Sequence, residues 1–246
     1  MEISQEEIRR NLEQVRERIR RAADKADRQL SEIRLVVVTK SHSVQVVRGA
    51  IDAGAKILGE NYAEEGLSKI QEIGSIPGVE WHMIGHVQSR KAVDVTGKFT
   101  LIHSLDSVKL AERINRVAEA KGWSQSVLIQ VNVSGEGSKS GLSCWNDGQM
   151  PAVTLEIEKI ASMPSVKIQG LMTIPPFTDN SEFGRPYFKR LRRIRDQLIG
   201  SFPGLNFSEL SMGMSADFEV AVEEGATLVR VGTAILGERI TQKDKR

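Results

Sequence analysis

The sequence predicts an α/β fold, a single (β/α)8 TIM barrel with an extra N-terminal helix. Short, β-branched segments alternate with longer amphipathic segments eight times along the chain. Each short segment is almost entirely apolar, which is typical of parallel strands that are covered on both faces. The 246 residues can bury one core of this size, so we expect one domain over residues 1–246.

The first element, over residues 1–30, has the pattern of an amphipathic helix that packs on the barrel. Its apolar residues recur three and four positions apart, with charged residues between them: Ile8, Leu12, Val15, Ile19, Ala22 and Ala26. The mixed charges argue against a secretory or transit segment, and no apolar run approaches the roughly 20 residues of a membrane helix.

Eight strands are predicted to follow this helix: Arg34–Lys40, Lys56–Asn61, Val79–His86, Thr100–Leu105, Ser126–Val133, Val166–Ile174, Phe207–Met212 and Thr227–Thr233. Helical segments connect them, and several of these stop at a glycine, as at Gly54, Gly122 and Gly225. A doubly wound sheet is the alternative, but it usually has about five or six strands. The irregular stretches Ser134–Met150 and Pro175–Asn180 follow strands, so we expect them to be loops over the barrel mouth.

Composition narrows the classes of partner. Lys and Arg number 34 against 32 Asp and Glu, a balance that favours neither nucleic acid nor a membrane surface. The basic run at 189–195 has helical apolar spacing and is interpreted as a solvated face. The lone Cys144 predicts a reducing compartment. We therefore expect a cytoplasmic monomer with a small-molecule partner and no metal, since His82 and His86 would lie about 13 Å apart on a strand.

Lys40 ends the first predicted strand, directly after an apolar run. This position aims its amine into the mouth of the barrel, where low-dielectric walls favour the neutral, nucleophilic form. The alternative is an ordinary solvated lysine at the end of a strand.

Two loops at the same rim have the composition of a phosphate site. They follow the last two strands, where barrels commonly bind phosphate through backbone N–H groups. Their hydroxyls and glycines include Ser211, Ser215, Gly232 and Thr233. Ser215 also has the alternative role of N-cap for the next helix. Arg230 interrupts an apolar strand, so we expect it to point into the barrel, where a buried arginine requires a partner.

Six segments together carry a family resemblance: VVVTK, GAKILGENYAEE, VEWHMIGHVQS, SKSGL, GLMTIPP and SELSMGMSADFEVAVEEGATLVRVGTAILGER. The sequence resembles the YggS-like pyridoxal phosphate homeostasis protein family, itself similar to the barrel domain of alanine racemases. The resemblance runs from about Arg34 to Arg239. It implies pyridoxal 5′-phosphate (PLP) as a Schiff base on Lys40, with Asn61 close to the cofactor and Arg230 facing the pyridine. The phosphate would contact the residues matching the family's loops, Ser211, Ser215, Gly232 and Thr233.

The resemblance implies that the protein holds and releases PLP to apo PLP-dependent enzymes without efficient amino-acid turnover. An arginine cannot accept the proton of a pyridinium, so the ring would be a weak electron sink. No second base is evident either, because Tyr187 lies in a helical pattern and Tyr62 only follows Asn61. The alternatives are a low-activity PLP-dependent racemase, decarboxylase or lyase, a PLP-free Schiff-base aldolase, and a regulatory module that senses PLP.

Overall fold

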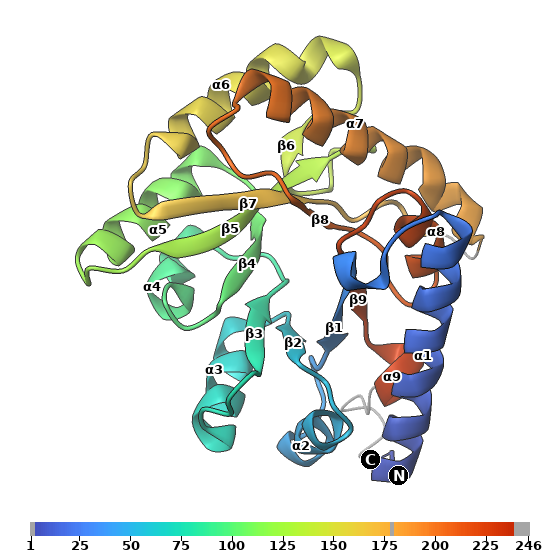
Figure 1. Ribbon diagram of the computed structural model, residues 1–246. Coiled ribbons are helices and arrows are strands. Elements are labelled where there is room, and N and C mark those ends of the chain that lie inside the picture. The colour runs from blue at the N-terminus through green and yellow to red at the C-terminus, as the bar shows by residue number, and fades with distance from the viewer. Residues whose placement is uncertain (1–2, 178–179, 239–246) are drawn as a thin grey trace.

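The computed structural model describes residues 3–177 and 180–238. In this part of the chain, eight parallel strands form a closed barrel with helices around it (Figure 1). Neighbouring strands follow the order β4-β3-β2-β1-β9-β8-β7-β5, and the pairing of β4 with β5 closes the ring. The predicted fold class is therefore confirmed.

The strands are β1 (Arg34–Val38), β2 (Ile57–Glu60), β3 (Glu80–Met83), β4 (Leu101–Leu105), β5 (Gln125–Asn132), β6 (Leu142–Ser143), β7 (Val166–Met172), β8 (Glu209–Ser211) and β9 (Leu228–Val231). The α-helices are α1 (Gln5–Lys25), α2 (Val44–Asp52), α3 (Ala63–Ile73), α4 (Ala92–Val95), α5 (Val108–Glu119), α6 (Met150–Ala161), α7 (Arg185–Ser201), α8 (Phe218–Glu223) and α9 (Thr233–Leu236).

Each of the eight predicted strands overlaps an observed strand in the same order, but most observed strands are shorter. Hydrogen bonding between neighbouring strands ends before the apolar segment does. For example, β1 ends at Val38, and the chain leaves the sheet there for the turn that contains Lys40. One expectation was wrong in detail: the predicted loop Ser134–Met150 contains β6 and a short 3-10 helix. The two residues of β6 pair with the carboxyl end of β5, which ties this loop to the barrel.

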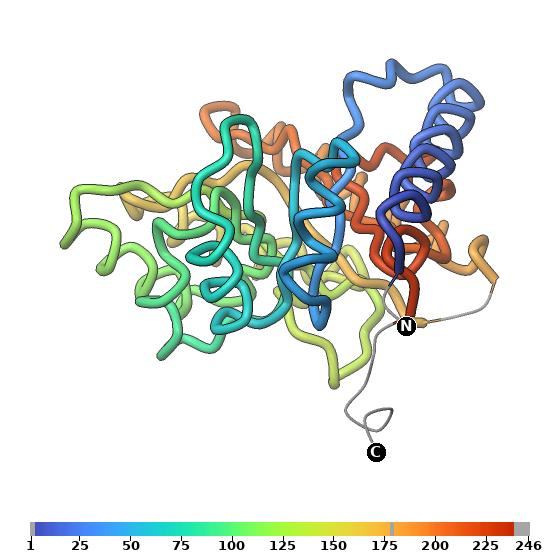
Figure 2. Tube along the Cα trace, turned by 90° about the horizontal axis from the view of Figure 1, so that it is seen from below, coloured from blue at the N-terminus to red at the C-terminus, as the bar shows by residue number. Residues whose placement is uncertain are grey.

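Helix α1 precedes β1, as predicted, but it ends at Lys25 rather than near residue 30. It begins with a capping box, in which Ser4 Oγ accepts from Glu7 N and the Glu7 carboxylate accepts from Ser4 N. Its apolar face packs on α8 and α9, so the first helix lies beside the last two described helices (Figure 2). The capped helix thus covers the barrel next to its last strand.

The barrel interior contains an apolar cluster that is separate from the layer between strands and helices. Its buried members are Val36, Ile57, Ile84, Leu101, Leu128, Met172 and Leu228. The larger cluster outside the strands includes the apolar face of α1 and those of the crossover helices. Apolar residues therefore cover both faces of the sheet, which explains why the strand segments do not alternate.

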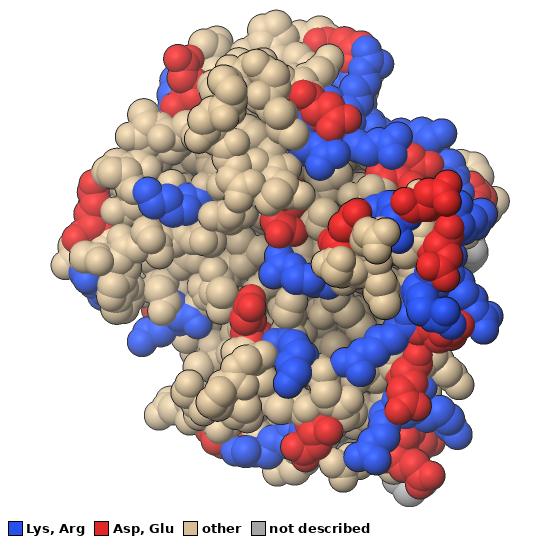
Figure 3. Space-filling view, in the orientation of Figure 1, with Lys and Arg blue, Asp and Glu red and all other residues tan. Residues whose placement is uncertain are grey.

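Charges are mixed over the face shown in Figure 3, where basic and acidic side chains alternate along the region of α1 and α7. The arginines of the predicted solvated run in α7 contact acidic residues: Arg190 and Arg193 pair with Asp147, and Arg192 with Glu224. Lys189 and Arg193 are exposed, in keeping with a solvated face, but the side chain of Arg190 is only 13% exposed and also donates to the carbonyl oxygen of Cys144. Among the described helices, none has the length and apolar content to cross a membrane.

Candidate functional site

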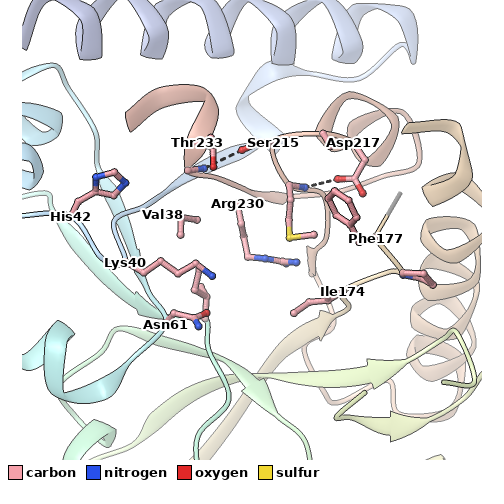
Figure 4. Close-up of a pocket in the computed structure, with 15 residues that line it drawn as sticks. Val38, Lys40, His42, Asn61, Ile174, Phe177, Ser215, Asp217, Arg230 and Thr233 are labelled. Atoms are coloured by element: carbon pink, nitrogen blue, oxygen red, sulfur yellow. Dashed lines mark hydrogen bonds between the residues drawn. The ribbon is translucent and has the colours of Figure 1, made fainter. Parts of the chain in front are cut away.

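A cavity of about 310 Å³ opens at the carboxyl ends of β1, β2, β8 and β9 (Figure 4). It is lined by Val38, Lys40, His42, Asn61, Ile84, Ile174, Pro176, Phe177, Met214, Ser215, Ala216, Asp217, Arg230, Gly232 and Thr233. In Figure 4 the side chains of Lys40, in the turn after β1, and of Arg230, in β9, extend into the same space. The cavity thus combines apolar walls, an amine and a guanidinium.

The structure brings six of the seven predicted site residues to this cavity. They are Lys40, Asn61, Ser215, Arg230, Gly232 and Thr233. Ser211 does not line it: its side chain is buried below Arg230, where the two are hydrogen bonded at 2.6 Å. Arg239, the last residue of the final sequence motif, lies outside the described residues.

The backbone on both sides of Lys40 is held by helix α3. Lys69 Nζ donates to the carbonyl oxygen of Thr39 at 2.7 Å, and Ser41 N donates to Glu65 Oε1 at 2.6 Å. Ser41 has a φ of 62°, in the left-handed region that few residues other than glycine adopt. The hydrogen bond from Ser41 to Glu65 stabilises this turn, so Lys40 projects from a fixed backbone.

A buried acid–base cluster lies behind this turn. Lys69 Nζ contacts Glu60 Oε1 at 2.8 Å and Glu65 Oε1 at 2.6 Å, and Thr39 Oγ1 donates to Glu60 Oε1 at 2.6 Å. Burial raises the pKa of Glu60, against the opposing effect of Lys69. Among the described residues, Glu60 Oε2 is the buried side-chain oxygen or nitrogen without a hydrogen-bond partner. The cluster therefore depends strongly on the cation of Lys69.

Arg230 forms the floor of the cavity. Its Nη1 donates to Ser211 Oγ at 2.6 Å and its Nη2 to the carbonyl oxygen of Thr173 at 2.9 Å. Burial lowers its pKa to about 10, and the carboxylate of Asp217 opposes that shift. The guanidinium is therefore still a cation at neutral pH and a fixed hydrogen-bond donor.

The loop between β8 and α8 forms one wall. Met214 N donates to Asp217 Oδ1 at 2.7 Å, and Gly232 N reaches Ser215 Oγ at 3.4 Å (Figure 4). Gly213 has a φ of 93°, and a Cβ there would lie 2.5 Å from that of Ala221. The alternative role of Ser215 as a helix N-cap is wrong, because Asp217 occupies the N-cap position of α8. The hydroxyl of Ser215 lies at the cavity instead.

Sequence reasoning missed part of the lining. Ile174, predicted as the end of a strand, lines the cavity after β7, together with Pro176 and Phe177 of the expected loop Pro175–Asn180. Phe177 is 84% exposed, and residues 178 and 179 of this loop lie outside the described residues. Ile174 and Pro176 lie in the GLMTIPP segment, which was the available signal, and Phe177 directly follows it. Tyr62 is 56% exposed and is not among the lining residues. Among the described residues, no group of three or more His, Cys, Asp or Glu could hold a metal ion.

Comparisons with known proteins identify the family of this chain. A sequence profile of the alanine racemase N-terminal domain matches residues 7–240. The pyridoxal phosphate homeostasis protein of Aquifex aeolicus (strain VF5) is 43% identical over 93% of this chain and 96% of its own length. That of Escherichia coli (strain K12) is 38% identical over 95% of this chain and 97% of its own length.

A solved structure of PipY from Synechococcus elongatus PCC7942 with PLP bound is 34% identical, with a TM-score of 0.77, over 89% of this chain and 100% of that chain. These matches span nearly all of both chains. The chain therefore belongs to the alanine racemase N-terminal domain family and, within it, to the pyridoxal phosphate homeostasis proteins.

Proposed function

We propose that this protein binds PLP as a Schiff base on Lys40 and holds it for release to apo PLP-dependent enzymes, without efficient amino-acid turnover. The observation that carries the proposal is that Lys40, Arg230 and the loops of Ser215 and Gly232 share one cavity. The names of the relatives and the PLP bound to PipY support the same function.

Each side chain has a distinct role in this proposal. Lys40 Nζ would hold PLP through a bond to its aldehyde carbon, with the aldehyde oxygen leaving as water. The hydroxyl of Ser215 and the backbone of Gly232 and Thr233 bind the phosphate. Arg230, which can only donate, faces the ring nitrogen. The position of Ser211 favours an action through Arg230 rather than contact with the phosphate.

The same residues explain why turnover is inefficient. PLP assists amino-acid chemistry by withdrawing electrons into a protonated ring nitrogen. A donor such as Arg230 stabilises the unprotonated ring instead. Racemisation also needs a base on each side of Cα, and Tyr62, the candidate for the second side, is not part of the cavity wall. Storage and transfer of PLP therefore suit the site better than catalysis.

Borohydride reduction tests the covalent site. Purified protein incubated with PLP should absorb visible light, lose that absorption on reduction, and carry the reduced pyridoxyl group on the peptide of Lys40. Lys40→Ala should lose this label, whereas Lys56→Ala, which changes an exposed lysine at the opposite end of the barrel, should retain it. Labelling mainly on another lysine of the wild-type protein would contradict the assignment.

Transfer is tested separately, with an apo PLP-dependent enzyme as acceptor. Protein loaded with PLP and freed of excess cofactor should restore activity to the apo-enzyme. Retention of the cofactor throughout the incubation would contradict a carrier role and favour a module that senses PLP.

A further inference from the structure

A chain of hydrogen bonds runs through the barrel interior below the cavity. Its contacts are Arg230 Nη1 to Ser211 Oγ at 2.6 Å, Ser211 Oγ to His103 Nδ1 at 2.8 Å, His103 Nε2 to His82 Nδ1 at 2.9 Å, and His82 Nε2 to Glu80 Oε2 at 3.1 Å. These residues come from four strands, β9, β8, β4 and β3. The chain thus links side chains that are far apart in sequence.

The chain connects the two ends of the barrel. Ser211 and His103 are 0% exposed and His82 is 1% exposed. The side chain of Glu80, by contrast, is 42% exposed. Glu80 and His82 line a second hollow of about 250 Å³ at the amino ends of the strands, on the opposite side from the cavity. One end of the chain is therefore the cavity floor and the other contacts solvent.

The direction of the hydrogen bonds follows from the carboxylate at the far end, because a carboxylate only accepts and a guanidinium only donates. Glu80 accepts from His82 Nε2, and burial lowers the pKa of both histidines, so each ring is neutral. Neutral His82 then accepts at Nδ1 from His103 Nε2, and neutral His103 accepts at Nδ1 from the hydroxyl of Ser211, whose oxygen accepts from Arg230. Both imidazoles thus carry their proton on Nε2.

The charges around the two histidines are consistent with neutral rings. Burial lowers the pKa of His82, although Glu80 on β3 and Glu209 on β8 oppose the shift; Arg34 on β1 adds to it. Burial, together with His82, Arg230 and Arg34, holds the pKa of His103 well below its usual value.

We propose that His103 and His82 are positioning residues for Arg230, which they hold through Ser211 in the orientation that binds the ring nitrogen of PLP. The inference rests on the proposed function, since it concerns how the same cavity binds the cofactor. A proton on His82 Nδ1 would place two N–H groups opposite each other across 2.9 Å. Acid therefore interrupts the chain of hydrogen bonds and weakens PLP binding. Protons enter at the exposed end, beside Glu80.

The decisive experiment compares PLP with its 1-deaza analogue, which keeps the aldehyde and the phosphate but has no ring nitrogen. His103→Phe should weaken PLP binding roughly tenfold, the lower end of what one charge-assisted hydrogen bond contributes. It should leave the affinity for the analogue unchanged. The control is His86→Gln, an exposed histidine that pairs with Asp106 outside the chain; it should bind both ligands as the wild type does.

A second variant tests the acid response. Glu80→Gln retains an acceptor for His82 but removes the negative charge that raises the pKa of that ring. PLP affinity at neutral pH should be unchanged, and the acid loss of binding should move to lower pH than in the wild type. An unchanged midpoint, or a shift to higher pH, would overturn the role of Glu80 and His82.

Two further outcomes decide the rest. Equal weakening of PLP and the analogue in His103→Phe, or no weakening of either, would overturn the positioning role while the proposed function stands. Failure of the wild type to bind PLP would overturn both. If His103→Phe does not fold, long-range ¹H–¹⁵N spectra of the wild type decide: both buried rings should be neutral with Nε2–H at pH 7, and an Nδ1–H form of either would overturn the proposal.

Discussion

Replacing Lys69 by methionine should strongly destabilise the protein and loosen the turn that carries Lys40. Lys69 is 4% exposed and donates three hydrogen bonds, to Thr39, Glu60 and Glu65. Methionine retains much of the side-chain volume but removes the cation and all three donors. The carboxylate of Glu60, which is 0% exposed, then has no cation beside it.

Loss of one partner from a buried ion pair costs about 3–5 kcal/mol, because the remaining charge is neither solvated nor paired. The whole free energy of unfolding of a typical domain is only about 5–15 kcal/mol. We therefore expect the free energy of unfolding of Lys69→Met to fall by about 3 kcal/mol or more at neutral pH. PLP affinity should fall as well, because Thr39 is released beside Lys40.

The pH dependence of this loss has a definite sign. Burial already raises the pKa of Glu60 above its ordinary value of 4.5. The charge of Lys69 is the largest influence that lowers this pKa again. Without Lys69, the native carboxyl holds its proton to higher pH than the unfolded one does. The variant should therefore be most stable at low pH and lose stability as the pH rises through the raised pKa of Glu60.

Urea unfolding at about pH 5 and about pH 8 measures both effects. The double variant Lys69→Met/Glu60→Gln should recover part of the stability at high pH, because it removes the buried charge together with its partner. Lys56→Met, at an exposed lysine beside β2, serves as the control. A loss below about 1 kcal/mol, as for a surface pair, or a pH profile parallel to that of the wild type, would refute the reasoning.

Three further predictions concern the cavity and the strand ends beside it. Ser215→Ala should weaken PLP binding about ten- to a hundredfold but spare pyridoxal, which has no phosphate; titration of both ligands checks this, and equal weakening would exclude phosphate contact. Gly85→Ala should cost about 1–3 kcal/mol in urea unfolding, because its Cβ would lie 2.0 Å from the carbonyl oxygen of Asn61, whereas Gly137→Ala enters open space. With L-alanine in deuterated water, the PLP-loaded protein should show little Cα exchange by NMR; enzyme-like exchange would favour a racemase.

The barrel and most of the cavity could be predicted from the sequence because both depend on local signals. Eight apolar strand segments specify the fold. Residues directly after parallel strands meet at one rim, which brought Lys40 to the same cavity as Gly232 and Thr233. The sequence did not show that Ser211 is buried in the barrel while Ser215 lines the cavity. That difference depends on where β8 ends, and β8 ends at Ser211.

Contacts between distant strands and helices could not be predicted in the same way. Glu60 and Lys69 lie in different elements, and their contact depends on how α3 packs against β2. The contact of His82 with His103 depends on the register of β3 against β4, and His103 meets Ser211 only across the closed interior. A single sequence contains no signal for either pairing, because register and side-chain direction are set by the closed barrel.

The direction of the hydrogen bonds in the barrel interior links the proposed binding of PLP to the proposed weak catalysis. Arg230 donates toward Ser211, and each group below it accepts from above and donates onward until the exposed carboxylate of Glu80. The guanidinium has no means of accepting a proton from a pyridinium. A ring nitrogen held by Arg230, as we propose, therefore stays unprotonated and withdraws electrons weakly. On this proposal, the donor that helps to bind the cofactor would also make amino acids bound to it react slowly.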